Sequence, residues 1–159
     1  MPSNNSDVAD VQDRLVALCA LIDLSDLSLG SITATEELGD CTISSLPTFE
    51  VARGRMISSR YESAGQFIIN REYYLRLYTA AICGDDATDN TSRSIAAACA
   101  LPVFRFFANR RTLWLTTGRD GVCHESQIVQ DTGDVRMSQG GQFYAGIMFR
   151  MQVVTRHRI

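Results

Sequence analysis

The C-terminal segment, Gln142–Ile159, has the residue pattern of one long β-strand. Every second residue starting at Phe143 is apolar, whereas the intervening positions are mixed and include Arg150 and Gln152. Because strand side chains alternate between the two faces of a sheet, this pattern predicts one buried face and one partly solvated face. Strands usually contain about five or six residues, so we expect this one to cross the whole sheet and organise the core.

The rest of the chain predicts a second long strand and two main helices. Residues 72–83 alternate in the same way and are rich in aromatic side chains, which strands favour. Apolar residues recur every three or four positions over residues 8–22 and again over residues 95–107. Pro102 lies inside the second helix, so we expect a kink there or two short helices meeting at Leu101.

Strands and helices are segregated along the chain more than they alternate. The sequence therefore predicts an α+β fold, a mostly antiparallel sheet with the two main helices packed on one face. With 159 residues, no internal repeat and no linker, residues 1–159 are expected to form a single domain. We expect a disordered N-terminus over residues 1–6. Exposed loops are expected over the polar residues 53–65 and over residues 84–91.

The composition is that of an ordinary soluble protein. The formal net charge is −3, which gives no general reason to expect nucleic acid or an anionic membrane as a partner. No apolar run is long enough to span a bilayer, and the polar, acidic N-terminus is unlike a secretory signal peptide. The sequence thus predicts a protein made in the cytosol that has no membrane partner.

Two groups of residues are weak candidates for catalysis. Cys123 and His124 are adjacent, but neighbouring strand residues point to opposite faces and do not readily hydrogen-bond each other. Asp85, Asp86 and Asp89 lack the spacing and the closing glutamate of a calcium-binding loop. No two of the five cysteines are spaced as in a zinc site. We therefore predict no catalytic residue, no cofactor and no metal, and expect a protein that is not an enzyme.

The basic residues need a different explanation, because all fifteen are Arg. Genomic base composition explains this bias, and so does work in protein interfaces, where the weakly hydrated guanidinium is favoured over ammonium. Individual Arg residues are either ordinary solvated charges and helix-end partners, or contacts in an assembly. The candidate inter-subunit, tube or lumen contacts are Arg53, Arg55, Arg60, Arg110, Arg111, Arg150 and Gln152.

Three segments together resemble a known family. They are NREYYLRLYTAAI (Asn70–Ile82), LPVFRFFANRRTL (Leu101–Leu113) and GGQFYAGIMFRMQVVTRHRI (Gly140–Ile159). The chain resembles the tail terminator, or tail-completion, proteins of long-tailed bacteriophages. In that family a last strand reads Tyr-x-Gly followed by alternating apolar residues, which Tyr144 and Gly146 match here.

The resemblance implies a structural virion protein. Such a protein would form a ring, commonly a homohexamer, that caps the tail tube and joins it to the neck. Its partners would be further copies of itself, the tail tube protein and a neck or head-completion protein. DNA would only pass through the channel without sequence recognition. The location would be the head-proximal end of the virion tail, and the host cytoplasm during assembly.

Three alternatives stay open at this point. A head-completion or head–tail connector subunit would differ from a terminator only by its position in the virion. A small cytosolic enzyme would use Cys123 or the Asp85, Asp86 and Asp89 group. A nucleic-acid-binding module would bind DNA with a steep dependence on salt.

Overall fold

The structure is a computed structural model that describes residues 6–39, 41–62, 65–84, 86–111, 113 and 122–158. Its elements, in chain order, are α1 (Ser6–Cys19), the 3₁₀ turn η1 (Ser25–Leu27), β1 (Thr33–Glu36), β2 (Thr48–Glu62), β3 (Gln66–Ala81), α2 (Asp86–Ala98), α3 (Ala100–Ala108), β4 (Val122–Asp131), β5 (Val135–Gln139) and β6 (Gln142–Arg158). Residues 1–5 of the expected disordered terminus lie outside the described residues. Ser6 does not belong to it, because α1 begins there.

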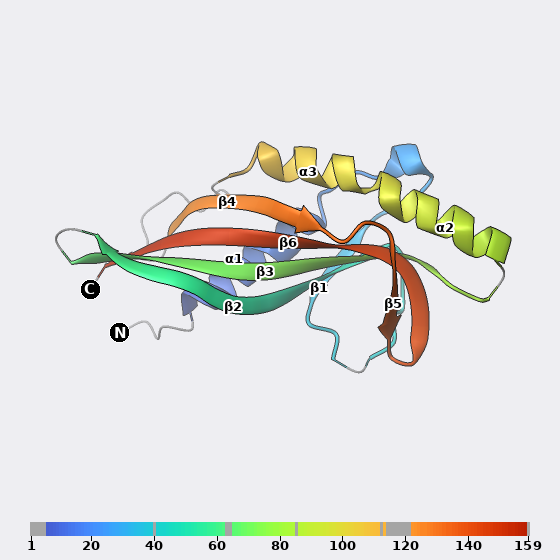
Figure 1. The fold of residues 1–159 in the computed structure, drawn as a ribbon, viewed down its shortest axis with the longest axis horizontal. Helices are drawn as coiled ribbons and strands as arrows, with labels where there is room; N and C mark the ends of the chain where they lie inside the picture. The colour runs from blue at the N-terminus through green and yellow to red at the C-terminus, as the bar shows by residue number, and fades with distance from the viewer. Residues whose placement is uncertain are drawn as a thin grey trace.

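The strands form one six-stranded sheet in the order β1-β2-β3-β6-β4, with β5 also paired to β6 (Figure 1). Among the strands that the structure describes, only β1 and β2 run parallel. The two long predicted strands, β3 and β6, are neighbours and pair from Gln66 opposite Arg158 to Ala81 opposite Tyr144. The C-terminal strand therefore crosses the whole sheet, as its alternation predicted.

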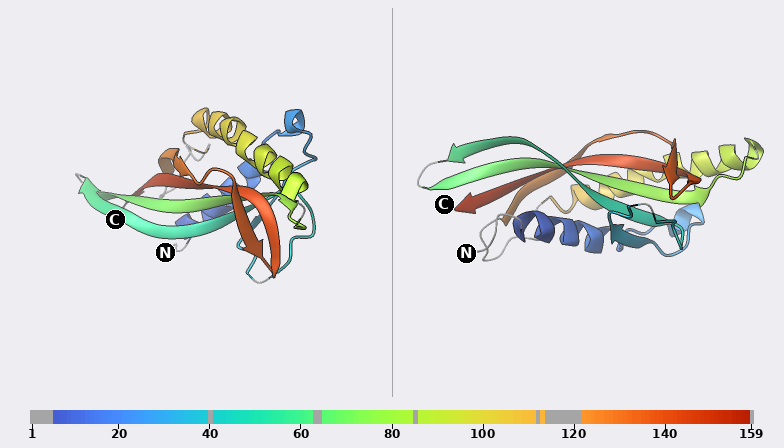
Figure 2. Two further views of the ribbon diagram at one scale, coloured as in Figure 1. Left: turned by 45° about the vertical axis from the view of Figure 1, so that its right-hand side comes forward. Right: turned by 90° about the horizontal axis from the view of Figure 1, so that it is seen from below.

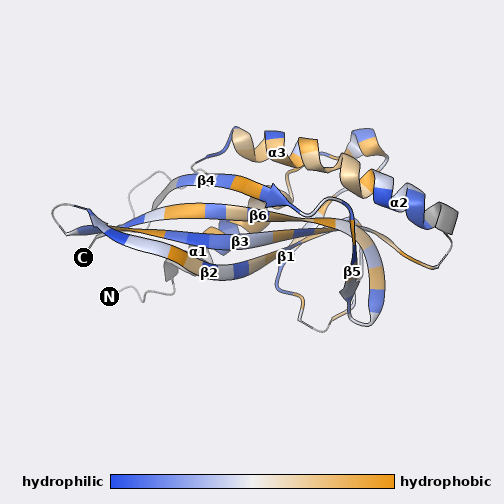
Figure 3. Cartoon of the chain, in the orientation of Figure 1, coloured by the Kyte–Doolittle hydropathy of each residue, from blue (hydrophilic) through white to orange (hydrophobic). Residues whose placement is uncertain are grey.

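A single apolar core lies between the sheet and the helices. It contains the alternate residues Leu75 and Leu77 of β3 and Ile147 and Phe149 of β6. The same cluster includes residues of α1 and of α3, so both helices cover the same face of the sheet (Figure 2). Figure 3 shows that α3 is hydrophobic over most of its length, whereas colours alternate along β3 and β6. The predicted α+β fold is confirmed.

The prediction of a loop over residues 53–65 was wrong. β2 continues to Glu62 and pairs with β3 in register from Ser58, opposite Asn70, to the end of the strand. The segment is polar because β2 is an edge strand beyond β1, so its side chains face solvent on both sides of the sheet. Pairing with β3 overrides the weak local strand signal. Two bulges, between Arg53 and Ser58, interrupt the ladder.

The prediction of a loop over residues 84–91 was also wrong, because α2 already begins at Asp86. Pro102, by contrast, has the expected effect. The helix is broken into α2 and α3, and the break lies at Cys99, two residues before the predicted position. Pro102 then falls in the first turn of α3, where its missing N–H removes no helical hydrogen bond.

The two ends of the sheet differ. At one end the β2–β3 hairpin reaches past the ends of α1 and α3, close to the C-terminus of the chain (Figure 1). At the other end, β6 bends and pairs with β5 through the turn at Gly140 and Gly141. Gln139 secures this end by donating to the carbonyl oxygens of Gly39 and Cys41, each at 2.7 Å.

Candidate functional site: the helix-free face of the sheet

The face of the sheet opposite the helices carries a row of ion pairs in which the acids are less exposed than their partners. We call this surface the helix-free face and define it by Glu50, Glu62, Glu72, Arg55, Arg60, Arg76, Arg150 and Arg156. These residues come from β2, β3 and β6, and the strand pairing brings them side by side.

Glu72 is the centre of this row. Its side chain is 3% exposed and accepts a hydrogen bond from the Tyr74 hydroxyl at 2.9 Å. Arg150 approaches it at 3.4 Å and Arg55 at 3.6 Å. Burying a carboxylate costs free energy unless it is paired and hydrogen-bonded, and these three groups supply the pairing and the hydrogen bond for Glu72. The Glu72 carboxylate in turn raises the pKa of Tyr74, chiefly through that hydrogen bond.

Gly54 explains how Glu72 can lie so deep. A Cβ atom at position 54 would lie 2.8 Å from both the Cβ atom and the carbonyl oxygen of Glu72. Only glycine leaves room for this approach of β2 to β3, at the point where the first bulge interrupts the ladder. Arg71 adds a long contact from its guanidinium to the Gly54 carbonyl oxygen, at 3.5 Å.

Glu50 forms a second buried pair further along the row. Its carboxylate accepts from Arg76 at 2.7 Å and from the backbone N–H of Leu38 at 2.7 Å. Nearby Tyr78 is buried, and burial together with the Glu50 carboxylate raises the pKa of Tyr78 to about 12. Beside this pair a polar concavity of about 320 Å³ is lined by residues that include Glu37, Arg53 and Gln139.

The row ends near the hairpin with Glu62, which lies 3.9 Å from Arg60 and 3.5 Å from Arg156. Along the whole row the guanidinium groups are the more exposed partners. Arg55 is 82% exposed and Arg60 is 74% exposed, whereas the acids beneath them are largely covered. The helix-free face therefore presents positive charge on a molecule whose formal net charge is negative.

The predicted contact residues fall into two places. Arg55, Arg60 and Arg150 lie on the helix-free face, and Gln152 is paired directly across from Glu72 on β3. Arg53 lies at the β2 edge, where its backbone N–H donates to Glu37 at 3.2 Å.

Arg110 and Arg111 are on the helix-bearing side, at the end of α3. Arg110 donates to the Phe106 carbonyl oxygen at 2.8 Å and lies 3.7 Å from the centre of the Phe106 ring, and Arg111 pairs with Glu125. Arg110 thus caps the end of its helix, and the structure does not bring these two residues together with the other five.

The sequence alone did not identify the Glu residues of the helix-free face as part of a site. Glu72 and Arg76 share the parity of the mixed face of β3, and Glu50 is flanked by the apolar residues Phe49 and Val51. A charge at alternate positions of a long, otherwise apolar strand was the available signal. Which cation would meet which acid depends on the register between strands, which no local pattern contains.

The described residues do not reveal how the two candidate catalytic groups are arranged. The side chains of Cys123, His124 and Asp86, and the whole of Asp85, lie outside the described residues, as does Trp114. Burial raises the pKa of the Cys19 thiol, and it raises that of Cys99 to about 11, which disfavours the reactive thiolate form of both. Among the residues described, no cluster of three His, Cys, Asp or Glu side chains is arranged to hold a metal. None of the described helices is long and apolar enough to cross a membrane.

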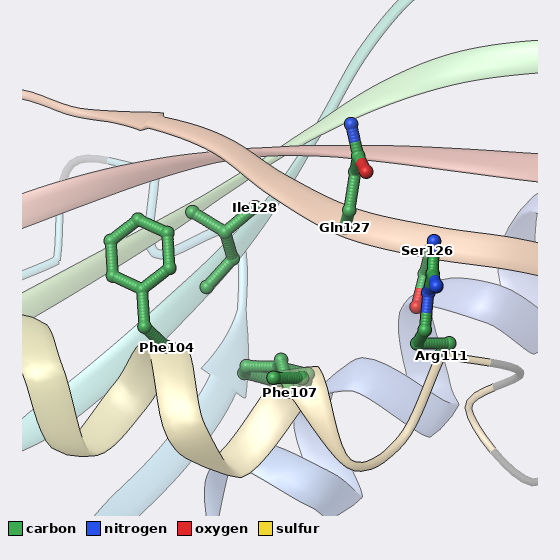
Figure 4. A pocket seen from close by; sticks show the side chains of 7 residues that line it. Phe104, Phe107, Arg111, Ser126, Gln127 and Ile128 are labelled. Carbon is green, nitrogen blue, oxygen red and sulfur yellow. The ribbon is translucent and has the colours of Figure 1, made fainter.

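A second concave region lies on the other side, between α3 and β4. It has a volume of about 260 Å³ and is lined by Phe104, Phe107, Ala108, Arg111, Ser126, Gln127 and Ile128. Figure 4 shows Phe104 and Ile128 pointing toward one another at one end, with Ser126 and Arg111 at the other. Its volume is below the roughly 300 Å³ at which small-molecule sites usually begin. The groove is therefore a weaker candidate than the helix-free face.

Comparison of the sequence with protein-family models and with curated protein sequences gave no match. The functional argument therefore depends on the residues and their geometry.

Proposed function

We propose that this protein is a ring-forming structural component of a bacteriophage virion, a tail terminator that caps the tail tube and joins it to the neck. The observation that carries the proposal is the asymmetry of the sheet. One face is sealed by helices over an apolar core, whereas the other presents Arg residues that are backed by buried Glu residues. A surface of this kind is suited to contacts with other macromolecules.

The chemistry of the exposed side chains favours protein partners. Guanidinium groups bind carboxylates with two parallel hydrogen bonds and lose hydration more easily than ammonium groups, so Arg is enriched in interfaces. Glu72 and Glu50 hold Arg150 and Arg76 in place from below, which reduces the entropy that these side chains lose on binding. The partners in this proposal are further copies of the chain, the tail tube protein and a neck protein.

A ring fits a protein that uses different surfaces to contact its two neighbours, because heterologous contacts that close form rings. Viral DNA would pass through its channel and would meet the protein only through its phosphates. The protein would act at the head-proximal end of the tail, after assembly in the host cytoplasm.

The experiment is a tube-capping assay with the purified tail tube protein of the same phage. Tube protein is polymerised with increasing amounts of the full chain, and the products are imaged by negative-stain electron microscopy. The proposal predicts ring-shaped particles with a central hole, tubes that carry a ring at one end, and tube growth that stops when the protein is in excess. Unchanged tube growth with bare tube ends would contradict it.

A further inference from the structure

The outer half of β2 is an exposed arm. We define the β2 arm as Arg55–Glu62, the part of the strand that runs along the edge of the hairpin and has β3 on one side only. It carries Arg55 and Arg60, and between them the exposed apolar residues Met56 and Ile57. Tyr61 follows and is 81% exposed.

The arm is supported from behind by contacts between three rings. The Tyr61 ring lies 6.2 Å from that of Phe67, and the Phe67 ring stacks on His157 at 5.0 Å. β6 thus supports the hairpin up to its last residues, where Phe67 is paired with His157. The arm is consequently presented as a fixed surface that needs little ordering when it binds.

The composition of the arm favours a protein over a nucleic acid. A phosphate-binding surface needs cations and gains nothing from exposed Met and Ile side chains. Interfaces between proteins combine apolar residues with Arg and Tyr, which supply much of the binding energy. The mixture of Met56, Ile57 and Tyr61 with Arg55 and Arg60 is of the second kind.

An acidic surface that matches the arm lies on the same chain. We define the acidic edge as Asp13 of α1, Glu36 of β1 and Glu37, which follows β1, all three with exposed side chains. The carboxyl of Asp13 hydrogen-bonds that of Glu36 and raises the pKa of Glu36, and the charge of Glu37 acts in the same direction. Arg53 opposes this effect.

Arg14 follows Asp13 in sequence, but its Nε donates to the carbonyl oxygen of Leu113 at 2.9 Å. Three carboxylates are gathered where α1 packs beside β1, and the approach of Asp13 disfavours the charged form of Glu36. Guanidinium groups from outside would relieve this repulsion.

We infer that the β2 arm of one copy binds the acidic edge of the next copy, with Arg55 and Arg60 facing Asp13, Glu36 and Glu37. The inference rests on the proposed ring assembly and names its subunit contact. The arm and the edge are different surfaces, so every bound copy still offers one of each to a further neighbour. A head-to-tail contact of this kind forms a ring when the rotation between successive copies closes. Arg60 and Tyr61 are neighbours in β2 and point to opposite faces, so the contact wraps around the open edge of the arm and covers Tyr61 on the side away from Arg60.

Charge reversal with rescue tests the contact. One variant carries Arg55→Glu and Arg60→Glu, a second carries Glu36→Arg and Glu37→Arg, and a third carries all four changes. Sedimentation velocity measures the mass of each at the concentration at which the wild-type chain is half assembled. We expect the first two variants to sediment as 17.6 kDa monomers. We expect the third, and an equimolar mixture of the first two, to assemble again because every reversed charge then meets a reversed partner.

Controls keep the result interpretable. Arg105→Glu on α3 and Asp26→Arg on η1 change exposed charges elsewhere and should leave the mass unchanged. Arg55 also contacts Glu72, so Arg60→Glu alone is measured in parallel, because it leaves the Glu72 cluster intact. It should weaken assembly in the same direction.

The outcomes separate the inference from the function on which it rests. A wild-type chain that stays monomeric alone and with tube protein would overturn both. Assembly that survives the reversals, or that is lost without rescue in the four-fold variant and in the mixture, would overturn the contact alone. Loss of binding to duplex DNA without any change in assembly would also overturn it, and would assign the arm to nucleic acid.

Discussion

The two faces of the central sheet are made from the same strands but are held by different interactions. On the covered face, Leu75 and Phe149 pack against α1 and α3 in a continuous apolar core. On the helix-free face, Glu72 lies equally deep but is held by Arg150 and Tyr74. Apolar packing gains from every contact, whereas a buried charge is tolerated only with its partners. One face therefore supplies stability, and the other is built to keep guanidinium groups in fixed positions at the surface.

The largest expected effect comes from the covered face. Phe149 is fully buried and its ring lies edge-to-face with Phe104 at 6.1 Å. Phe149→Ala should lower the free energy of unfolding by about 3–5 kcal/mol, because it removes buried apolar surface and leaves a cavity. Urea unfolding measures the change. Phe143→Ala is the matched control in the same strand, since Phe143 is 45% exposed and should cost less than about 1 kcal/mol.

The helix-free face should respond in a way that apolar packing does not. Arg150→Leu removes a partner of the buried Glu72 and should cost about 3 kcal/mol, because the carboxylate then keeps only the exposed Arg55 and the Tyr74 hydroxyl. The double variant Arg150→Leu with Glu72→Leu should recover much of that loss, since neither charge then remains. Urea unfolding of the single and double variants gives the coupling between the two sites. Losses that simply add would show that this face does not depend on paired charge.

A smaller effect is expected at high pH from Tyr78. Burial and the Glu50 carboxylate raise the pKa of Tyr78 to about 12, above the value of 10.0 for a free tyrosine. The folded state thus favours the protonated phenol, and this contribution to stability is complete below pH 10 and is lost as the pH rises from 10 to about 12. Unfolding free energies measured across this interval should fall more steeply for the wild-type chain than for Tyr78→Phe. Parallel curves would contradict the assignment.

The smallest change in stability should come from the β2 arm. Arg60 is 74% exposed and lies 3.9 Å from Glu62, so the pair is screened by solvent. Arg60→Ala should change the free energy of unfolding by less than about 0.5 kcal/mol. The same substitution should still weaken assembly, as measured by the concentration at half assembly. If Arg60→Ala lowered the free energy of unfolding by as much as it lowered the free energy of assembly, the distinction between the two faces would be removed.

Much of the fold could be predicted from the sequence because its main strands carry their own pattern. In β6 every second residue from Phe143 is apolar, and this alternation indicates which side of the strand is buried. The apolar stripes of α1 and α3 indicate the buried side of each helix in the same way. The β2 arm carries no such pattern. Its side chains are polar because it is an edge strand, and only pairing with β3 makes it a strand.

The candidate site was predictable only in part. Arg150 and Gln152 stand on the mixed face of a predicted strand, so their partly solvated position followed from alternation alone. The role of Glu72 did not, because it depends on the register that places β3 against β6 and on the room left by Gly54. Contacts between segments far apart in sequence are set by tertiary pairing, and no local pattern contains them.

The most direct test asks which surface makes the subunit contact. It compares hydrogen–deuterium exchange of the assembled full chain with that of the monomeric Arg60→Glu variant. The account predicts slower amide exchange in the assembly along residues 55–62 and around residues 36–37. It also predicts unchanged exchange along α2 and α3. Slower exchange along α2 and α3, with residues 55–62 unchanged, would place the subunit contact on the helix-bearing side and contradict the account.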